Sequence, residues 1–167
     1  MFKSKTTKSL AMSGLIAAAY VVLTYVFQPI SYGPIQLRVS EIFTILPAIT
    51  KTAIPGLMVG CIISNLSSPF GLVDIILGTS ATLIASILTY YTRKITFKGV
   101  PVLGPLFPVL ANALIVGAEI TFFVPSGTGT FAAYAISALQ IGIGELIVCY
   151  GFGIPFFVAL KKFLVKK

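Results

Sequence analysis

Apolar segments long enough to cross a bilayer recur along this chain and constrain its fold more than any other feature. A bilayer core of about 30 Å takes about 20 apolar residues as a helix. Residues 9–28, 72–92, 103–124 and 130–160 meet that length. The chain is also 57% hydrophobic and only 10% charged, too little charge for the surface of a soluble protein of 167 residues. The sequence therefore predicts an all-α integral membrane protein with a single domain, residues 1–167.

The region between the first two long segments is apolar but interrupted by "PAITKTAIP". We interpret it as two short helices, 39–50 and 53–66, that turn around Lys51. A re-entrant hairpin is the alternative, but it buries Lys51 in lipid at a cost of about 3 kcal/mol. Two short spans let Lys51 reach the headgroups, so the prediction is six transmembrane helices.

Basic residues form three blocks beside predicted helix ends, and the positive-inside rule places such blocks in the cytoplasm. Six spans satisfy all three blocks with both termini inside. The N-terminus resembles a signal peptide, but its apolar run is long and no soluble protein follows, so we interpret it as a retained first helix. The blocks are Lys3, Lys5 and Lys8; Arg93, Lys94 and Lys98; and Lys161, Lys162, Lys166 and Lys167.

The chain has four acidic residues, and all of them fall within the apolar segments. Glu41 and Asp74 lie at the outer ends of the second and fourth helices, where first-turn acids can simply favour the helix dipole. Glu119 and Glu145 lie deeper, where a carboxylate costs about 2.5 to 3.5 kcal/mol. Either an interhelical hydrogen bond or a polar pocket would compensate that cost. We favour a polar pocket that opens to the outside.

Further polar residues share the faces of the predicted fifth and sixth helices. Asn112 lies seven residues before Glu119, and Tyr134 lies eleven before Glu145, so each pair occupies one helix face. Gln140 lies between Tyr134 and Glu145 in depth but on another side. We expect all five to line the pocket.

Glu145 is predicted to be the deepest substrate contact, because its neighbours in "IGIGELIV" offer it no cation. Gly142 and Gly144 leave room beside it for a flat ligand or for another helix.

The loop "QPISYGPIQLR" between the first two helices is rich in Pro and Gly, which is typical of a shaped cap. Arg38 and Glu41 follow it, three residues apart at a helix start, and are close enough to pair or to share a ligand. We expect them to hold this lid loop in register over the pocket. In a watered vestibule the pair would contribute at most about 1 kcal/mol.

Several kinds of chemistry are disfavoured by what the sequence lacks. It has no histidine and no paired carboxylate spacing, so neither an intramembrane enzyme nor a metal or cofactor site is predicted. Cys61 and Cys149 fall inside predicted helices and are interpreted as small apolar residues rather than a disulfide. The sequence contains no P-loop and no clear inverted repeat. A capture subunit that borrows energy from a partner fits these features best.

Small residues on the first helix indicate a close helix–helix contact. Ser13 and Ala17, and Gly14 and Ala18, form two overlapping small-xxx-small pairs. The contact is either with a partner protein or within the monomer.

Five segments along the chain carry a resemblance to a known family. They are "YGPIQLRVSEIFTILP", "AIPGLMVGCIISNL", "DIILGTSATLIAS", "NALIVGAEITFF" and "GELIVCYGFGIPF". These segments resemble the QueT family, the queuosine-precursor transporters that serve as substrate-capture (S) components of energy-coupling factor (ECF) transporters, and the similarity covers residues 8–160. It implies six helices, a transmembrane T component and two cytoplasmic ATPases as partners, and docking through an A-x-x-x-A pattern on the first helix. Here the matching stretch is Ser13-xxx-Ala17 and Gly14-xxx-Ala18.

The implied substrate is a 7-deazaguanine base, whose neighbouring N–H donors suit one carboxylate in a forked contact. An aminomethyl form carries a positive charge that a second carboxylate could meet. Tyr134 or Phe131 could stack on the ring. Three alternatives stay open: an S component for another small vitamin-like ligand, a stand-alone proton-coupled transporter using Glu119 or Glu145, and a membrane scaffold without a ligand.

Overall fold

The computed structural model describes residues 2–33, 35–124 and 127–165, and this part of the chain consists of helices and their connections. Pro34 of the predicted lid loop and the terminal Lys166 and Lys167 lie outside the described residues. The helices are α1 (Phe2–Val26), α2 (Gln28–Ser31), the 3₁₀-helix η1 (Val39–Ala48), α3 (Ala53–Asn65), α4 (Leu72–Thr92), α5 (Leu106–Ala111), the π-helical segments η2 (Asn112–Val116) and η3 (Glu119–Phe123), α6 (Phe131–Leu146), the π-helical η4 (Ile147–Gly153) and α7 (Ile154–Val165).

Four helical stretches are long and apolar enough to cross a membrane: Thr6–Val26, Leu72–Thr92, Leu106–Phe123 and Phe131–Phe163. This agrees with the predicted all-α membrane protein. The last stretch runs without a break through α6, η4 and α7.

The two short helices are also present, on either side of the turn that carries the exposed Lys51. η1 has 10 residues and rises about 2.0 Å per residue as a 3₁₀-helix. α3 has 13 residues at about 1.5 Å each. Both are therefore only about 20 Å long, so six spans and cytoplasmic termini stay predictions.

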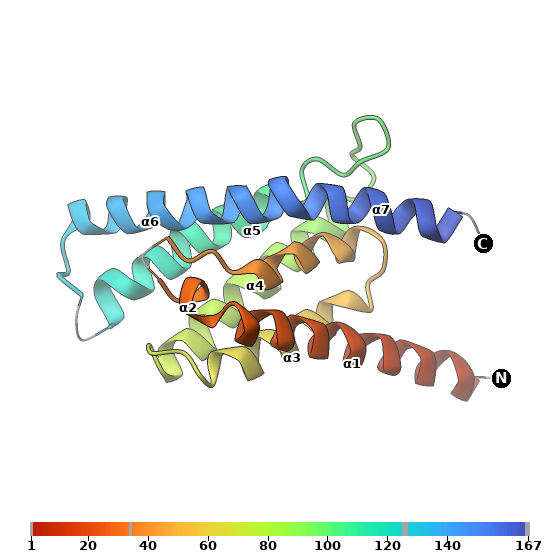
Figure 1. Ribbon diagram of the computed structural model, residues 1–167, viewed down its shortest axis with the longest axis horizontal. Helices are drawn as coiled ribbons and strands as arrows, with labels where there is room; N and C mark the ends of the chain where they lie inside the picture. Colours follow the sequence, from red (N-terminus) through yellow and green to blue (C-terminus); the bar gives the residue numbers. More distant parts are fainter. Residues whose placement is uncertain (1, 34, 125–126, 166–167) are drawn as a thin grey trace.

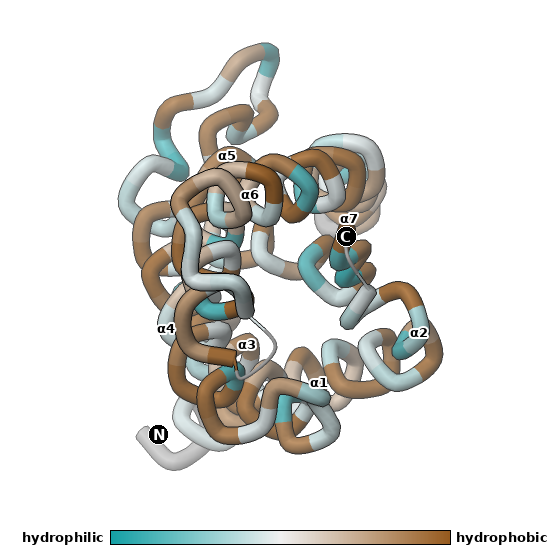
Figure 2. Tube along the Cα trace, turned by 90° about the vertical axis from the view of Figure 1, so that its left-hand side faces the viewer, coloured by the Kyte–Doolittle hydropathy of each residue, from teal (hydrophilic) through white to brown (hydrophobic). Residues whose placement is uncertain are grey.

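The helices form one bundle, with both chain ends and the connection after α4 at one end (Figure 1). The connections that follow α1 and α3 lie at the opposite end. Seen along the bundle, the helices surround a common axis and the trace is mostly hydrophobic (Figure 2). η1 contacts α1, α3, α4, η4 and α7, so this short helix lies inside the bundle rather than at its edge.

The contact between α1 and α3 depends on two glycines of α3. A Cβ atom at Gly56 would lie 2.7 Å from the backbone oxygen of Ser13, and one at Gly60 would lie 2.9 Å from Cβ of Tyr20. Glycines at this spacing let two helix backbones approach closely. The sequence analysis found the small residues of α1 but missed Gly56 and Gly60, their partners on α3.

The expected space beside Glu145 is partly filled. A Cβ atom at Gly144 would collide with the backbone oxygen of Ile35, so the loop before η1 lies directly against α6 there. Gly142 has only an ordinary contact with Ala113. The prediction that Gly144 leaves room for a ligand is therefore wrong, because this loop occupies the space.

Candidate functional site

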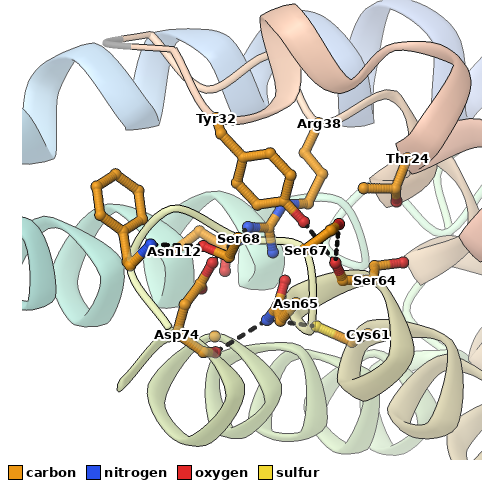
Figure 3. A network of polar contacts seen from close by, with 12 residues as sticks. Thr24, Tyr32, Arg38, Cys61, Ser64, Asn65, Ser67, Ser68, Asp74 and Asn112 are labelled. Carbon is orange, nitrogen blue, oxygen red and sulfur yellow. Dashed lines mark hydrogen bonds and ion pairs between the residues drawn. The ribbon is translucent and has the colours of Figure 1, made fainter. Parts of the chain in front are cut away.

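Buried polar side chains gather toward the end of the bundle opposite the chain termini. They come from different elements. Asn65 ends α3, Asp74 lies in the first turn of α4, and Glu119 starts η3. Arg38 precedes η1, and Figure 3 shows it close to Asn65 and Asp74. The cluster also includes Gln36, Glu41, Asn112 and Glu145, and all eight side chains are buried.

Arg38 is the only buried Lys or Arg in the described part of the chain, and it lies at the centre of the cluster. Its side chain is 3% exposed, and its Nη2 atom is 3.6 Å from Oδ2 of the fully buried Asp74. It points between Tyr32 and Asn65 (Figure 3), and its Cζ atom is 5.3 Å from the centre of the Tyr32 ring. Arg38 therefore pairs with Asp74 of α4 and not with Glu41, so of the two alternatives for Arg38 and Glu41 only a shared ligand stays a prediction.

Arg38 is also within electrostatic range of the other three carboxyl groups, Glu41, Glu119 and Glu145. Burial by itself lowers the pKa of Arg38, but Asp74 together with Tyr20, Cys61 and Tyr32 outweighs that effect, so the pKa is raised well above its ordinary value. The guanidinium therefore stays charged. One charged guanidinium therefore lies within electrostatic range of four carboxyl groups.

Glu41 is held by protein donors. The Tyr20 hydroxyl donates to Oε1 of Glu41 at 2.5 Å, and the Thr82 hydroxyl lies 3.5 Å from the same oxygen. These bonds connect η1 to α1 and α4. Glu41 lies in the first turn of η1, as the sequence indicates, but it is fully buried and hydrogen bonded to neighbouring helices.

Glu145 is also held by protein donors. The Asn112 amide donates to its Oε1 atom at 2.9 Å, and the Cys149 thiol donates to its Oε2 atom at 3.3 Å. The first of these is the interhelical hydrogen bond that the sequence left as an alternative. Cys61 and Cys149 are both free and buried, as the sequence predicts.

Glu119 is fully buried and, among the described residues, neither of its carboxyl oxygens has a hydrogen-bond partner and it forms no ion pair. Asp74 also lacks hydrogen-bond partners, but it is paired with Arg38. Leaving a buried polar group unpaired costs about 1 to 3 kcal/mol, so such groups need an explanation. Other cluster atoms without a hydrogen-bond partner are Glu41 Oε2, Asp74 Oδ1 and Oδ2, Asn65 Oδ1, Asn112 Oδ1, Gln36 Nε2 and Arg38 Nη2.

A cleft of about 310 Å³ opens near the cluster, between the loop before η1 and α6. Tyr32 and Gln140 line it, as does Ile120, the residue after Glu119. Gln140 thus lines this cleft and is not part of the cluster. Tyr134 lies elsewhere: its ring is 5.9 Å from that of Phe122 and 6.0 Å from that of Phe131. The structure does not bring Tyr134 or Phe131 to the buried groups.

Two cluster residues, Asn65 and Gln36, and the adjacent Tyr32 were missed by the sequence analysis. Asn65 is a polar residue at the end of an apolar helix, and its amide donates to the backbone oxygen of Asp74 at 2.9 Å. Gln36 has a φ of 47°, a conformation that non-glycine residues rarely adopt and that often marks functional sites. The Tyr32 hydroxyl donates to the Ser64 backbone at 2.8 Å. Polar residues at the ends of apolar helices would have been a usable signal.

Irregular helical geometry coincides with the cluster. Asn112 starts the π-helical η2, Glu119 starts η3, and η4 begins two residues after Glu145. Single π-helical turns inside longer helices are frequent at functional sites, because the extra residue per turn redirects side chains.

The small residues of α1 divide between two surfaces. Ser13 and Ala17 face α3, and the Ser13 hydroxyl donates to the Thr52 backbone at 2.8 Å. Gly14 and Ala18 are exposed, and a Cβ atom at Gly14 would meet nothing within 4 Å. A groove of about 900 Å³ runs along this part of α1 and α3. Of the four small residues predicted to bind a partner, Ser13 and Ala17 therefore pack inside the protein, and Gly14 and Ala18 are exposed.

Comparison with known proteins relates the chain to one family. The model of the family described as "QueT transporter" matches residues 10–162. The chain is 43% identical over 86 residues to the "Queuosine precursor transporter QueT" of Lactococcus lactis subsp. cremoris (strain MG1363). That match spans 50% of this chain and 50% of the relative. No solved structure matches the chain significantly.

Proposed function

Because the chain belongs to the QueT transporter family, we propose that it is the substrate-capture subunit of an ECF-type uptake transporter and binds a queuosine precursor, a 7-deazaguanine base. The family is one of transporters and not of enzymes, and with several apolar helices the chain is a multi-pass protein of the plasma membrane. The buried polar cluster is the proposed binding site.

The observation that carries this proposal is the set of buried atoms without hydrogen-bond partners. It mixes donors, on Arg38 and Gln36, with acceptors on Asn65, Asn112 and Glu119. A guanine-like edge presents N–H donors next to a carbonyl acceptor, so it can satisfy both kinds at once. A purely apolar or a polyanionic ligand would leave the acceptors unpaired.

The proposed partners are a transmembrane T component and two cytoplasmic ATPases. The exposure of α1 supports a protein contact there: 22% of its span is buried inside the bundle, against 44% for Leu72–Thr92 and for Leu106–Phe123. Gly14 and Ala18 lie on its open face, where a T-component helix can approach closely.

Calorimetry of the detergent-purified protein tests the substrate. We expect heat of binding with 7-deazaguanine bases and none with anionic vitamins, because the cluster holds four acids and one arginine. Asn112→Leu removes an acceptor in the cluster and should weaken binding. The control is Tyr134→Phe, which alters a side chain outside the cluster and should leave ligand binding unchanged. Binding of a vitamin but of no deazaguanine would favour an S component for another ligand.

Measuring uptake into proteoliposomes distinguishes coupling to ATPase partners from coupling to protons. An ECF-type subunit requires the T component and active ATPases. Uptake by the isolated chain that a protonophore abolishes would instead favour a stand-alone proton-coupled transporter, with Glu119 or Glu145 as the proton carrier.

A further inference from the structure

The charge balance of the buried cluster is uneven. It contains four carboxyl groups, and Arg38 is the only buried cation among the described residues. Arg38 lies against Asp74 at 3.6 Å. Three carboxyl groups are thus left without a cation of their own inside the protein. Burying an ionised carboxylate without a partner is costly, so a ligand that brings positive charge gains more here than a neutral one.

The three remaining acids are not equivalent. Glu41 accepts a hydrogen bond from Tyr20, and Glu145 accepts from Asn112 and Cys149. Glu119 accepts none, although it is fully buried. An unused carboxylate has two oxygens with free lone pairs, which suits an ammonium group with its three donors.

Glu119 lies close to a surface cleft in the chain. Its neighbour Ile120 lines the cleft beside Tyr32, whereas Glu119 itself is buried and does not line it. A ligand that enters this cleft is therefore one residue away from Glu119. Asp74 and Arg38 are the charged groups that act on it. An ammonium beside Glu119 would therefore meet one free carboxylate, with the Arg38–Asp74 pair close by and nearly neutral overall.

We propose that Glu119 binds a protonated amine on the ligand and thereby selects positively charged bases over neutral bases of the same shape. This inference rests on the proposed function, because it concerns the same binding site. It assigns the charge of the ligand and the residue that recognises that charge. The ring is then recognised by the amide and guanidinium groups of Asn65, Asn112 and Arg38. Glu119 is a specificity-determining residue.

The test compares two ligands of nearly equal shape, 7-aminomethyl-7-deazaguanine and 7-hydroxymethyl-7-deazaguanine, by calorimetry on the full chain in detergent. The parent protein should bind the amine about 10- to 150-fold more tightly, the range expected for one charge-assisted contact. Glu119→Gln should bring this ratio to within about threefold of unity. Glu119→Asp keeps the charge and should retain a preference for the amine.

Glu145→Gln is the matched control, because it removes the same group from a carboxylate that already has two protein donors. It should change both affinities by a similar factor and keep their ratio. If the parent protein binds both ligands equally, or if Glu119→Gln weakens both equally, the charge-reading role is wrong and the proposed substrate class survives. If the parent protein binds neither, the substrate class fails and this inference with it. Should Glu119→Gln not fold, the parent ratio and Glu119→Asp still decide.

Discussion

The polar cluster and the α1–α3 contact are both buried, but they are built in opposite ways. At the α1–α3 contact the backbones are so close that Gly56 and Gly60 have no space for a Cβ atom, and the Ser13 hydroxyl is hydrogen bonded. In the cluster, Glu119 and several amide and guanidinium atoms have no hydrogen-bond partner. Complete packing marks a contact that holds the fold together, whereas unpaired buried groups mark a place where a ligand is expected.

The largest effect on stability is expected at the centre of the cluster. Arg38→Ala leaves the fully buried Asp74 without its cation, which should lower the free energy of unfolding by about 3 to 5 kcal/mol. The sequence alone predicted at most about 1 kcal/mol, because it placed Arg38 in water. Thermal unfolding in detergent measures the loss.

The double variant Arg38→Ala/Asp74→Ala is the control for that prediction. It removes both charges, so it should regain much of the lost stability. If the double variant unfolds as readily as Arg38→Ala, the ion pair is not the cause, and the cluster would resemble the packed contact more than we infer.

A smaller loss of stability is expected at the α1–α3 contact. Gly56→Val places a side chain 2.7 Å from the Ser13 backbone oxygen, and such overpacking costs about 1 to 3 kcal/mol. Gly14→Leu, on the open face of the same helix pair, should change stability by less than about 0.5 kcal/mol. It should instead reduce co-purification with the T component. Equal losses of melting temperature in both variants would mean that the two halves of the α1 face do not differ.

The smallest expected effect is a difference in stability between variants of two acids in the cluster, Glu145 and Glu119. Glu145→Gln disturbs hydrogen bonds with Asn112 and Cys149 and should cost about 1 kcal/mol in the ligand-free protein. Glu119→Gln breaks no hydrogen bond and should leave the melting temperature unchanged or higher. A loss for Glu119→Gln equal to that for Glu145→Gln would show that Glu119 has a structural partner.

Sequence analysis alone determined the class of this protein and named several residues of its site. Apolar segments of about 20 residues in a chain with 10% charged residues require a membrane protein, because backbone groups in lipid must be satisfied within helices. The same reasoning singled out Glu119 and Glu145, since a carboxylate deep in an apolar segment is costly. Asn65 and Gln36 carry no charge, so this cost argument could not find them.

The partners of those residues were decided only by the tertiary structure. Arg38 and Glu41 are three residues apart in sequence, yet one turns to Asp74 and the other to Tyr20, because η1 lies between α1 and α4. Likewise, Ser13 and Gly14 are adjacent, and only the position of α3 makes one buried and the other open. Helix periodicity specifies which residues share a face, but not which neighbouring helix that face meets. The latter depends on contacts between segments far apart in the sequence. Among the described residues, these contacts leave Glu119 as the acid with neither a hydrogen bond nor an ion pair.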